Sequence, residues 1–176
     1  MNITAGIYKG SKVKAPDEKI VRPTLSKIRE SVFNTLFSLM GNFGEKNFLD
    51  MFAGSGIMGL EALSRGFENV VAIEKNPKVA AILKENYANI KLKANLILGD
   101  SLKKLPNLSE KFDVIYLDPP YFSGIYEKSL ETIKENGLLK EDGIIILEHT
   151  TEVNTDGFKL IKQKKYSQKL LTFLSN

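Results

Sequence analysis

From residue 46 onward, short apolar runs alternate with segments whose apolar residues recur at helical spacing. The apolar runs are rich in Val, Ile and Leu and lack the regular polar alternation of a sheet with one solvent-exposed face. Such runs, linked by helices, indicate a doubly wound α/β fold with a mostly parallel sheet covered on both faces. We expect strands over 48–52, 69–74, 96–98, 112–117 and 143–148, and helices over 57–65, from 77 onward, and over 126–136.

The C-terminal part of the chain does not continue this alternation of strands and helices. Two strand-like runs, 159–162 and 169–174, flank residues 164–168 with no helix between them. Two strands linked without a helical crossover must pair as antiparallel neighbours. An antiparallel hairpin is therefore expected at the end of the sheet.

The N-terminal part is also distinct. Apolar residues at helical spacing predict an amphipathic leading helix over 23–40, which opens at Thr24 and has as its apolar face Leu25, Ile28, Val32, Leu36 and Leu39. Residues 1–22 predict a small hairpin extension. A length of 176 residues suits one compact domain, so we expect a single domain whose Rossmann-like core spans 46–176.

Composition excludes several classes of site. The chain has no cysteine and one histidine, His149, so we expect neither disulfides nor a transition-metal site. No apolar run approaches the roughly 20 residues that span a bilayer, and the first residues do not resemble a signal peptide. A cytoplasmic protein with no membrane contact is expected, whose chemistry depends on carboxylates, backbone groups, basic side chains or an organic cofactor.

Positive charge gathers at both ends of the chain. Residues 1–30 hold seven basic and three acidic side chains, and residues 158–176 hold five lysines and no acid. A basic rim around a more acidic body is typical of proteins that bind nucleic acid. Lysines that merely keep surface strands solvated would give the same pattern.

A glycine-rich turn follows the first core strand. Gly54, Gly56 and Gly59 match G-x-G-x-x-G between a strand and a helix, where glycine permits a tight turn and close approach to a ligand. A dinucleotide site fits the glycines equally well, but Asp50 closes the strand as in sites for a methyl donor, where no pyrophosphate has to be held. The expected cofactor contacts in this turn are Asp50, Phe52, Ala53, Gly54, Ser55, Gly56 and Gly59.

Acidic residues also follow the next two strands. Glu74 ends the second strand, 20 residues after Gly54, where a carboxylate can accept hydrogen bonds from ribose hydroxyls. Asp100 and Ser101 follow the third strand, where a carboxylate can bind the adenine amino group. The alternatives are a solvated strand end for Glu74 and a helix cap for Asp100.

The sequence Asp118-Pro119-Pro120-Tyr121 follows the fourth strand. The prolines lack N–H groups and have restricted φ angles, which favours outward carbonyls that accept hydrogen bonds. Asp118 adds a further acceptor, and Tyr121 offers a ring on which a base can stack. A planar amine needs such acceptors, because its nitrogen is a poor nucleophile until its hydrogens are held and it faces the methyl donor. These four residues are therefore the candidate catalytic residues for transfer from S-adenosylmethionine to an exocyclic amine; a rigid loop after the strand is the alternative.

The chain resembles a known family, the bacterial 16S ribosomal RNA (guanine(966)-N2) methyltransferases. The resemblance covers nearly the whole chain and rests on Ala5-Gly6, Tyr8-Lys9-Gly10, Arg22-Pro23-Thr24, Lys27 to Glu30, Phe33-Asn34, Asp50 to Gly66 and Asp118 to Tyr121. It implies a seven-stranded class I methyltransferase fold, cofactor binding by the glycine turn, Glu74 and Asp100, and chemistry at Asp118 to Tyr121. It also implies a guanine of 16S rRNA as substrate. Because a small enzyme without a recognition domain needs another source of specificity, we expect this RNA to be folded within an assembled or assembling 30S subunit.

The resemblance further implies that the segment around Arg22 and the helix bearing Arg29 approach the active site. Together with the N-terminal lysines, this gives an expected substrate-binding set of Lys9, Lys12, Lys14, Arg22, Thr24, Arg29 and Tyr121. The nearest rival is a DNA adenine-N6 or cytosine-N4 amino-methyltransferase, which usually needs an added target-recognition domain. A non-catalytic RNA-binding assembly protein and a nicotinamide-dependent oxidoreductase are further alternatives.

Overall fold

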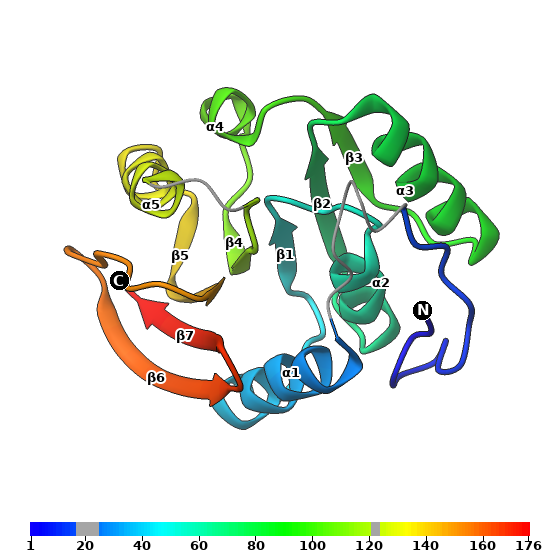
Figure 1. Cartoon of the computed structure of the whole chain (residues 1–176), viewed down its shortest axis with the longest axis horizontal. Coiled ribbons are helices and arrows are strands. Elements are labelled where there is room, and N and C mark those ends of the chain that lie inside the picture. Colours follow the sequence, from blue (N-terminus) through cyan, green and yellow to red (C-terminus); the bar gives the residue numbers. More distant parts are fainter. Residues whose placement is uncertain (17–24, 121–123) are drawn as a thin grey trace.

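The computed structural model describes residues 1–16, 25–120 and 124–176, and within them a seven-stranded sheet in the order β3-β2-β1-β4-β5-β7-β6 (Figure 1). Strands β1 to β5 pair in parallel, while β7 is antiparallel to both β5 and β6. The expected doubly wound, mostly parallel sheet with an antiparallel C-terminal hairpin is thereby confirmed. The strands are β1 (Asn47–Asp50), β2 (Asn69–Glu74), β3 (Asn95–Leu98), β4 (Phe112–Leu117), β5 (Leu139–His149), β6 (Lys159–Tyr166) and β7 (Lys169–Ser175).

Helices cover both faces of the sheet, as Figure 1 shows. One face packs against α1 (Ser26–Met40), α2 (Ile57–Ser64) and α3 (Pro77–Asn89). The other packs against α5 (Ile125–Glu135) and the short helical segment formed by α4 (Ser101–Lys104) and η1 (Leu105–Asn107). Two hydrophobic layers therefore enclose the central strands of the sheet, whereas β6 at its edge is largely exposed.

Strand β4 shows why the sequences of the core strands are continuous apolar runs. Val114 and Tyr116 belong to the layer under α1, while Ile115 and Leu117 belong to the layer under α5. All four are at most 1% exposed. Because successive side chains of a strand point to opposite faces, both sets must be apolar when both faces are covered.

The leading helix differs from its expected form. It begins at Ser26, with Leu25 as its N-cap residue, and Thr24 lies outside the described residues. Leu25 and Leu39 are 62% and 42% exposed, so the expected apolar face was wrong at both ends. Phe33 is buried in addition to Ile28, Val32 and Leu36, because its ring packs among those of Phe43, Phe48 and Phe67.

Two strands of the C-terminal half are longer than expected. Strand β5 begins at Leu139 rather than at 143, and β6 continues to Tyr166, which pairs with Lys169. A tight turn at 167–168 replaces the expected longer connection, and Ser167 takes the positive φ of 56° that such a turn requires. The lysines of this segment thus belong to a strand.

The N-terminal hairpin is present in a reduced form. Asn2 and Lys12 form a single antiparallel bridge, and the apolar Ile3 and Val13 are buried in the core. The Ser64 carbonyl of α2 accepts a hydrogen bond from the Ile7 backbone N–H at 2.8 Å. The hairpin therefore packs on α2. No helix within the described part of the chain is long and apolar enough to cross a membrane.

Candidate active site

Three carboxylates meet at the carboxyl ends of β1, β2 and β4. Asp50 lies opposite Ala72 of β2 and opposite Tyr116 of β4 in the parallel ladders. Glu74 and Asp118 each come two residues after those partners, so strand alternation places them on the same face as Asp50. Both carboxylates raise the pKa of Asp50, as close neighbours would. The structure thus brings these three predicted residues together.

Asp50 is the most unusual of the three. Its residue is 1% exposed, and neither carboxylate oxygen has a well-formed hydrogen bond within the described residues. Burial is the main cause that raises its pKa from 3.8 to about 8, an effect partly offset by the Phe52 backbone N–H and increased by Asp118 and Glu74. A buried acid beside two other carboxylates is an environment suited to a positively charged ligand group.

Glu74 holds the glycine turn in shape. Its Oε2 accepts a hydrogen bond from the Gly54 N–H at 2.9 Å, and its Oε1 accepts one from the Asn76 N–H at 2.7 Å. Gly54 has a φ of 53°, a conformation that glycine adopts without strain. Each carboxylate oxygen has a second lone pair, so Glu74 can also accept hydrogen bonds from a ligand.

The other two glycines are required by packing between helices. A Cβ at Gly59 would lie 2.1 Å from the Tyr87 hydroxyl, and one at Gly56 would lie 2.7 Å from the Tyr87 ring. Tyr87 is a buried residue of α3, and α3 therefore packs against the turn and α2 at the positions that lack side chains. Close helix packing explains Gly59, and Gly56 in addition has a φ of 81°, a conformation that glycine adopts without strain.

The remaining residues of the turn make backbone contacts. The Ala53 N–H donates to the Ile73 carbonyl at 2.9 Å, and the Ser55 carbonyl accepts from the Asn86 side chain at 2.9 Å. Phe52 is partly buried against the second hydrophobic layer. Asn86 was not predicted, although a polar residue on the apolar face of α3 was a visible signal.

Asp100 and Ser101 lie beside the end of β1. Asp100 is the N-cap residue of α4, and its carboxylate forms an ion pair with Lys75 at 2.8 Å, which lowers the pKa of Asp100. The Ser101 hydroxyl donates to the Met51 carbonyl and so attaches α4 to the residue after β1. Both residues therefore border the same edge of the sheet as Asp50.

The proline turn follows β4 directly. Asp118 is partly exposed, Pro119 is buried and Pro120 is exposed, while Tyr121 lies outside the described residues. The negative charge of Asp118 raises the pKa values of both Asp50 and Tyr116. Asp118 therefore lies close to both residues. The turn therefore presents a carboxylate at the edge of the sheet.

The predicted substrate-binding residues are not all accessible. Lys9, Lys12 and Lys14 are exposed on the N-terminal hairpin, and Lys14 forms an ion pair with Glu85 at 2.9 Å. Arg22 and Thr24 lie outside the described residues.

Arg29 requires a correction. It is 2% exposed, lies 3.2 Å from Glu61 and donates to the Asn2 carbonyl at 2.8 Å. This burial between the hairpin and α2 gives Arg29 a structural contact in place of the expected RNA contact.

Two buried polar residues attach the hairpin to the glycine turn and its helix, and neither was predicted. Glu61 of α2 accepts hydrogen bonds from the Thr4 N–H and hydroxyl. Asn86 of α3 exchanges two hydrogen bonds with the Lys14 backbone and also binds the Ser55 carbonyl. These hydrogen bonds link the hairpin that carries the exposed lysines to the glycine turn of the candidate active site.

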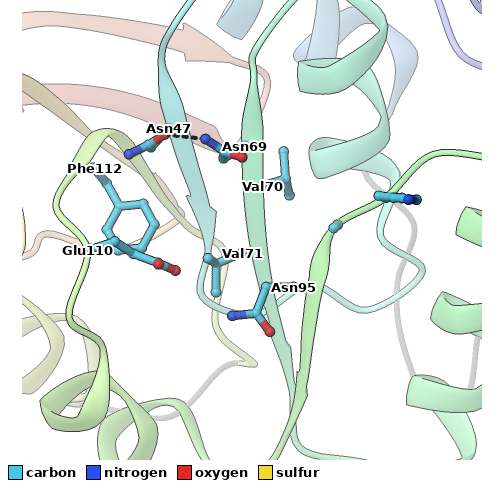
Figure 2. Close-up of a pocket in the computed structure, with 9 residues that line it drawn as sticks. Asn47, Asn69, Val70, Val71, Asn95, Glu110 and Phe112 are labelled. Atoms are coloured by element: carbon cyan, nitrogen blue, oxygen red, sulfur yellow. Dashed lines mark hydrogen bonds between the residues drawn. The ribbon is translucent and has the colours of Figure 1, made fainter.

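One cavity of the described part of the chain is remote from these residues. It has a volume of about 350 Å³ and lies at the amino ends of the strands, where Asn47, Asn69 and Asn95 begin β1, β2 and β3 (Figure 2). The carboxylate cluster lies at the opposite edge. Within the described ranges, no group of three or more His, Asp or Glu side chains could hold a metal ion.

Comparisons with known proteins identify the family of the chain. The family model described as "Conserved hypothetical protein 95" matches residues 1–175. The ribosomal RNA small subunit methyltransferase D of Haemophilus influenzae is 33% identical over 172 residues, which cover 93% of this chain and 88% of that protein. The protein of the same name from Escherichia coli is 31% identical over 153 residues, 86% of this chain and 76% of that protein.

A solved structure supports the same conclusion. The protein yhhF from Escherichia coli superposes with a TM-score of 0.88 and 27% sequence identity, and the match covers 99% of this chain and 96% of that one. The similarity therefore extends over the hairpin, the leading helix and the whole sheet. The chain belongs to the family described as conserved hypothetical protein 95 and is a relative of the bacterial ribosomal RNA small subunit methyltransferases D.

Proposed function

We propose that this protein transfers a methyl group from S-adenosylmethionine to the exocyclic N2 amine of a guanine in 16S rRNA of the small ribosomal subunit. The observation that carries the proposal is the buried Asp50, flanked by Glu74 and Asp118 at the strand end that precedes the proline turn. The names of its relatives, which are ribosomal RNA small subunit methyltransferases, support the substrate class.

The carboxylate cluster fits this cofactor. When bound, S-adenosylmethionine supplies a methyl group activated by a positively charged sulfonium, and it also carries a cationic ammonium group. Asp50 lacks a well-formed hydrogen bond within the described residues, so a cationic ligand would satisfy a buried acid that the fold leaves uncompensated. Glu74 would accept from the ribose hydroxyls and Asp100 from the adenine amino group, while the turn around Gly54 would approach the ligand backbone.

The proline turn would hold the target base. Asp118 accepts a hydrogen bond from the guanine amine, and the carbonyls of the turn hold its second hydrogen, so the nitrogen faces the methyl donor. Tyr121 stacks on the base and fixes the plane of its ring. The contribution of these groups is orientation and electrostatic stabilisation in the transition state, where the amine nitrogen becomes positively charged.

Recognition of RNA would come from the basic ends of the chain. Lys9, Lys12 and Lys14, together with Arg22, would bind phosphates near the target base, and the lysines of the C-terminal strands would contribute less. A chain of this size has few surfaces for reading sequence, so we propose a folded 30S particle in the cytoplasm as the substrate whose shape supplies specificity.

Transfer of labelled methyl groups tests the proposal directly. The parent protein should methylate 30S particles more efficiently than naked 16S RNA and should leave DNA unmodified. Asp118→Ala should nearly abolish turnover with cofactor affinity mostly intact, because Asp118 acts on the amine in the transition state. Asp113→Asn is a matched control at the opposite end of β4 and should retain parental turnover. Methylation of DNA in place of ribosomal substrates would contradict the proposed function.

A further inference from the structure

Glu148 connects the two sides of the proline turn. It lies near the end of β5, next to β4, and is 1% exposed. Its carboxylate Oε2 accepts a hydrogen bond from the Tyr116 hydroxyl at 2.5 Å. Its backbone carbonyl accepts another from the Tyr126 hydroxyl, also at 2.5 Å. One residue of the sheet therefore binds two tyrosines that come from different elements.

These tyrosines bracket the candidate catalytic turn in the sequence. Tyr116 precedes Asp118 by two residues, and Tyr126 lies in the first turn of α5, five residues after Tyr121. Strand β5 is itself paired on both sides, with β4 and with β7, which makes it a rigid part of the sheet. Both tyrosines that bracket Asp118 are thus attached to one buried residue of a central strand.

The charge of Glu148 is compensated by the C-terminal hairpin. Lys169 of β7 forms an ion pair with the Glu148 carboxylate, and the Lys169 side chain is 16% exposed. Burial and the nearby carboxylates of Glu148, Asp118 and Asp50 raise the pKa of Tyr116 well above its usual value of 10. Tyr116 therefore stays protonated and donates its hydroxyl hydrogen to the Glu148 carboxylate.

We infer that Glu148 is a positioning residue of the methyl-transfer site, which holds the Asp118 turn in place through Tyr116 and Tyr126 and is itself paired with Lys169. This inference rests on the proposed function. Its physical basis is the steep dependence of transfer rate on geometry, since a displacement of about 1 Å at a reacting group can cost about 100-fold in rate. The C-terminal hairpin thereby influences the position of the Asp118 turn through Lys169 and Glu148, although none of its residues belongs to that turn.

Tyr116→Phe and Tyr126→Phe test the inference, because each removes one hydroxyl and leaves the ring in the core. Each variant should lower kcat on 30S particles by about tenfold or more, with cofactor Kd and substrate KM within about twofold of the parent. Asp113→Asn is the matched control. It removes an ion pair with Lys140 that joins the amino ends of β4 and β5, away from the candidate active site. Its kcat should match that of the parent.

A double variant separates the roles of Lys169 and Glu148. Lys169→Met leaves a buried carboxylate uncompensated and should lower both the melting temperature and kcat. Adding Glu148→Gln makes the pair neutral and keeps an oxygen for Tyr116, so the double variant should recover part of both losses. A double variant with lower kcat than Lys169→Met alone would count against the inference.

Hydrogen exchange provides a readout that does not depend on turnover. The backbone amides of Leu117, Asp118 and residues 124–126 should exchange faster in Tyr116→Phe and Tyr126→Phe than in the parent or in Asp113→Asn. Unchanged exchange together with parental kcat in both tyrosine variants would overturn the inference. Loss of methyl transfer in the parent itself would contradict the proposed function, whereas the exchange comparison would still decide whether Glu148 holds the turn.

Discussion

Asp50 has an environment that ordinary surface acids lack. The fold places it inside the protein, at the end of β1, with two other carboxylates on the same face and without a compensating cation within the described residues. Its folded-state pKa of about 8 lies above the unfolded value of 3.8, so the folded protein keeps a proton that the unfolded chain releases. Stability from this group is present at low pH and is lost as the pH rises toward about 8.

Asp50→Asn should remove this pH dependence, because the amide does not titrate. Between pH 5 and 7, the free energy of unfolding of the parent should fall relative to that of the variant by about 1.4 kcal/mol per pH unit, the slope for one proton. Urea denaturation at several pH values measures the difference. Parallel curves for parent and variant over this range would show that Asp50 is ionised in the folded protein.

Helix α2 illustrates how one element serves both the site and the core. Its N-cap residue, Gly56, belongs to the turn beside Asp50, and all eight of its residues are buried. Its contact with α3 leaves no room for a side chain at Gly59, where a Cβ would meet both the Tyr87 hydroxyl at 2.1 Å and Val70 at 2.8 Å. Packing alone therefore requires a glycine at this position of the helix.

Gly59→Ala should lower the free energy of unfolding by about 1–3 kcal/mol, the usual cost of overpacking a core. Tyr87→Phe removes the nearest clashing atom, so the double variant should recover part of the loss. Gly44→Ala serves as the control, because the nearest atom to its Cβ is 3.9 Å away. If Gly59→Ala unfolds at the same denaturant concentration as the parent, the proposed packing constraint is wrong.

Charge is separated over the whole molecule. Carboxylates gather at the strand ends that form the candidate site, while exposed lysines occupy the hairpin at one end of the chain and β6 at the other. An acidic site suits a cationic cofactor, and basic flanks suit a polyanion. The structure refines the expected contribution of each lysine, because Lys14 is already paired with Glu85.

Replacement of Lys9, Lys12 and Lys14 with Ala should weaken RNA binding most strongly at low salt and spare cofactor affinity. Each lost phosphate contact flattens the dependence of log K on log salt by about one unit, so the two lysines that lack the Glu85 contact should account for about two units. The matched control replaces three exposed lysines of β6, Lys159, Lys162 and Lys165, and should have a smaller effect. Equal slopes for parent and hairpin variant would make the hairpin a purely structural element.

The spacing of apolar residues, and the segments that separate the apolar runs, were sufficient to predict the architecture. The continuous apolar runs predicted strands buried on both faces, and the absence of a helix between 159–162 and 169–174 predicted an antiparallel pair; the sheet confirms both. These features are local, because the spacing of apolar side chains determines which faces a strand or helix can bury. Because the carboxyl ends of parallel strands lie at one edge of a sheet, the carboxylates at the ends of three core strands could also be expected there.

Contacts between distant segments were decided only by the tertiary structure. Nothing near Arg29 in the sequence indicates that Glu61 and the Asn2 carbonyl surround it, and nothing near Tyr87 indicates that Gly59 must yield space to it. The same holds for Glu148, whose partners Tyr116, Tyr126 and Lys169 lie on three other elements. Amino-acid order specifies which surfaces are apolar or charged, but burial and pKa values depend on which surfaces meet, and that is a property of the packed molecule alone.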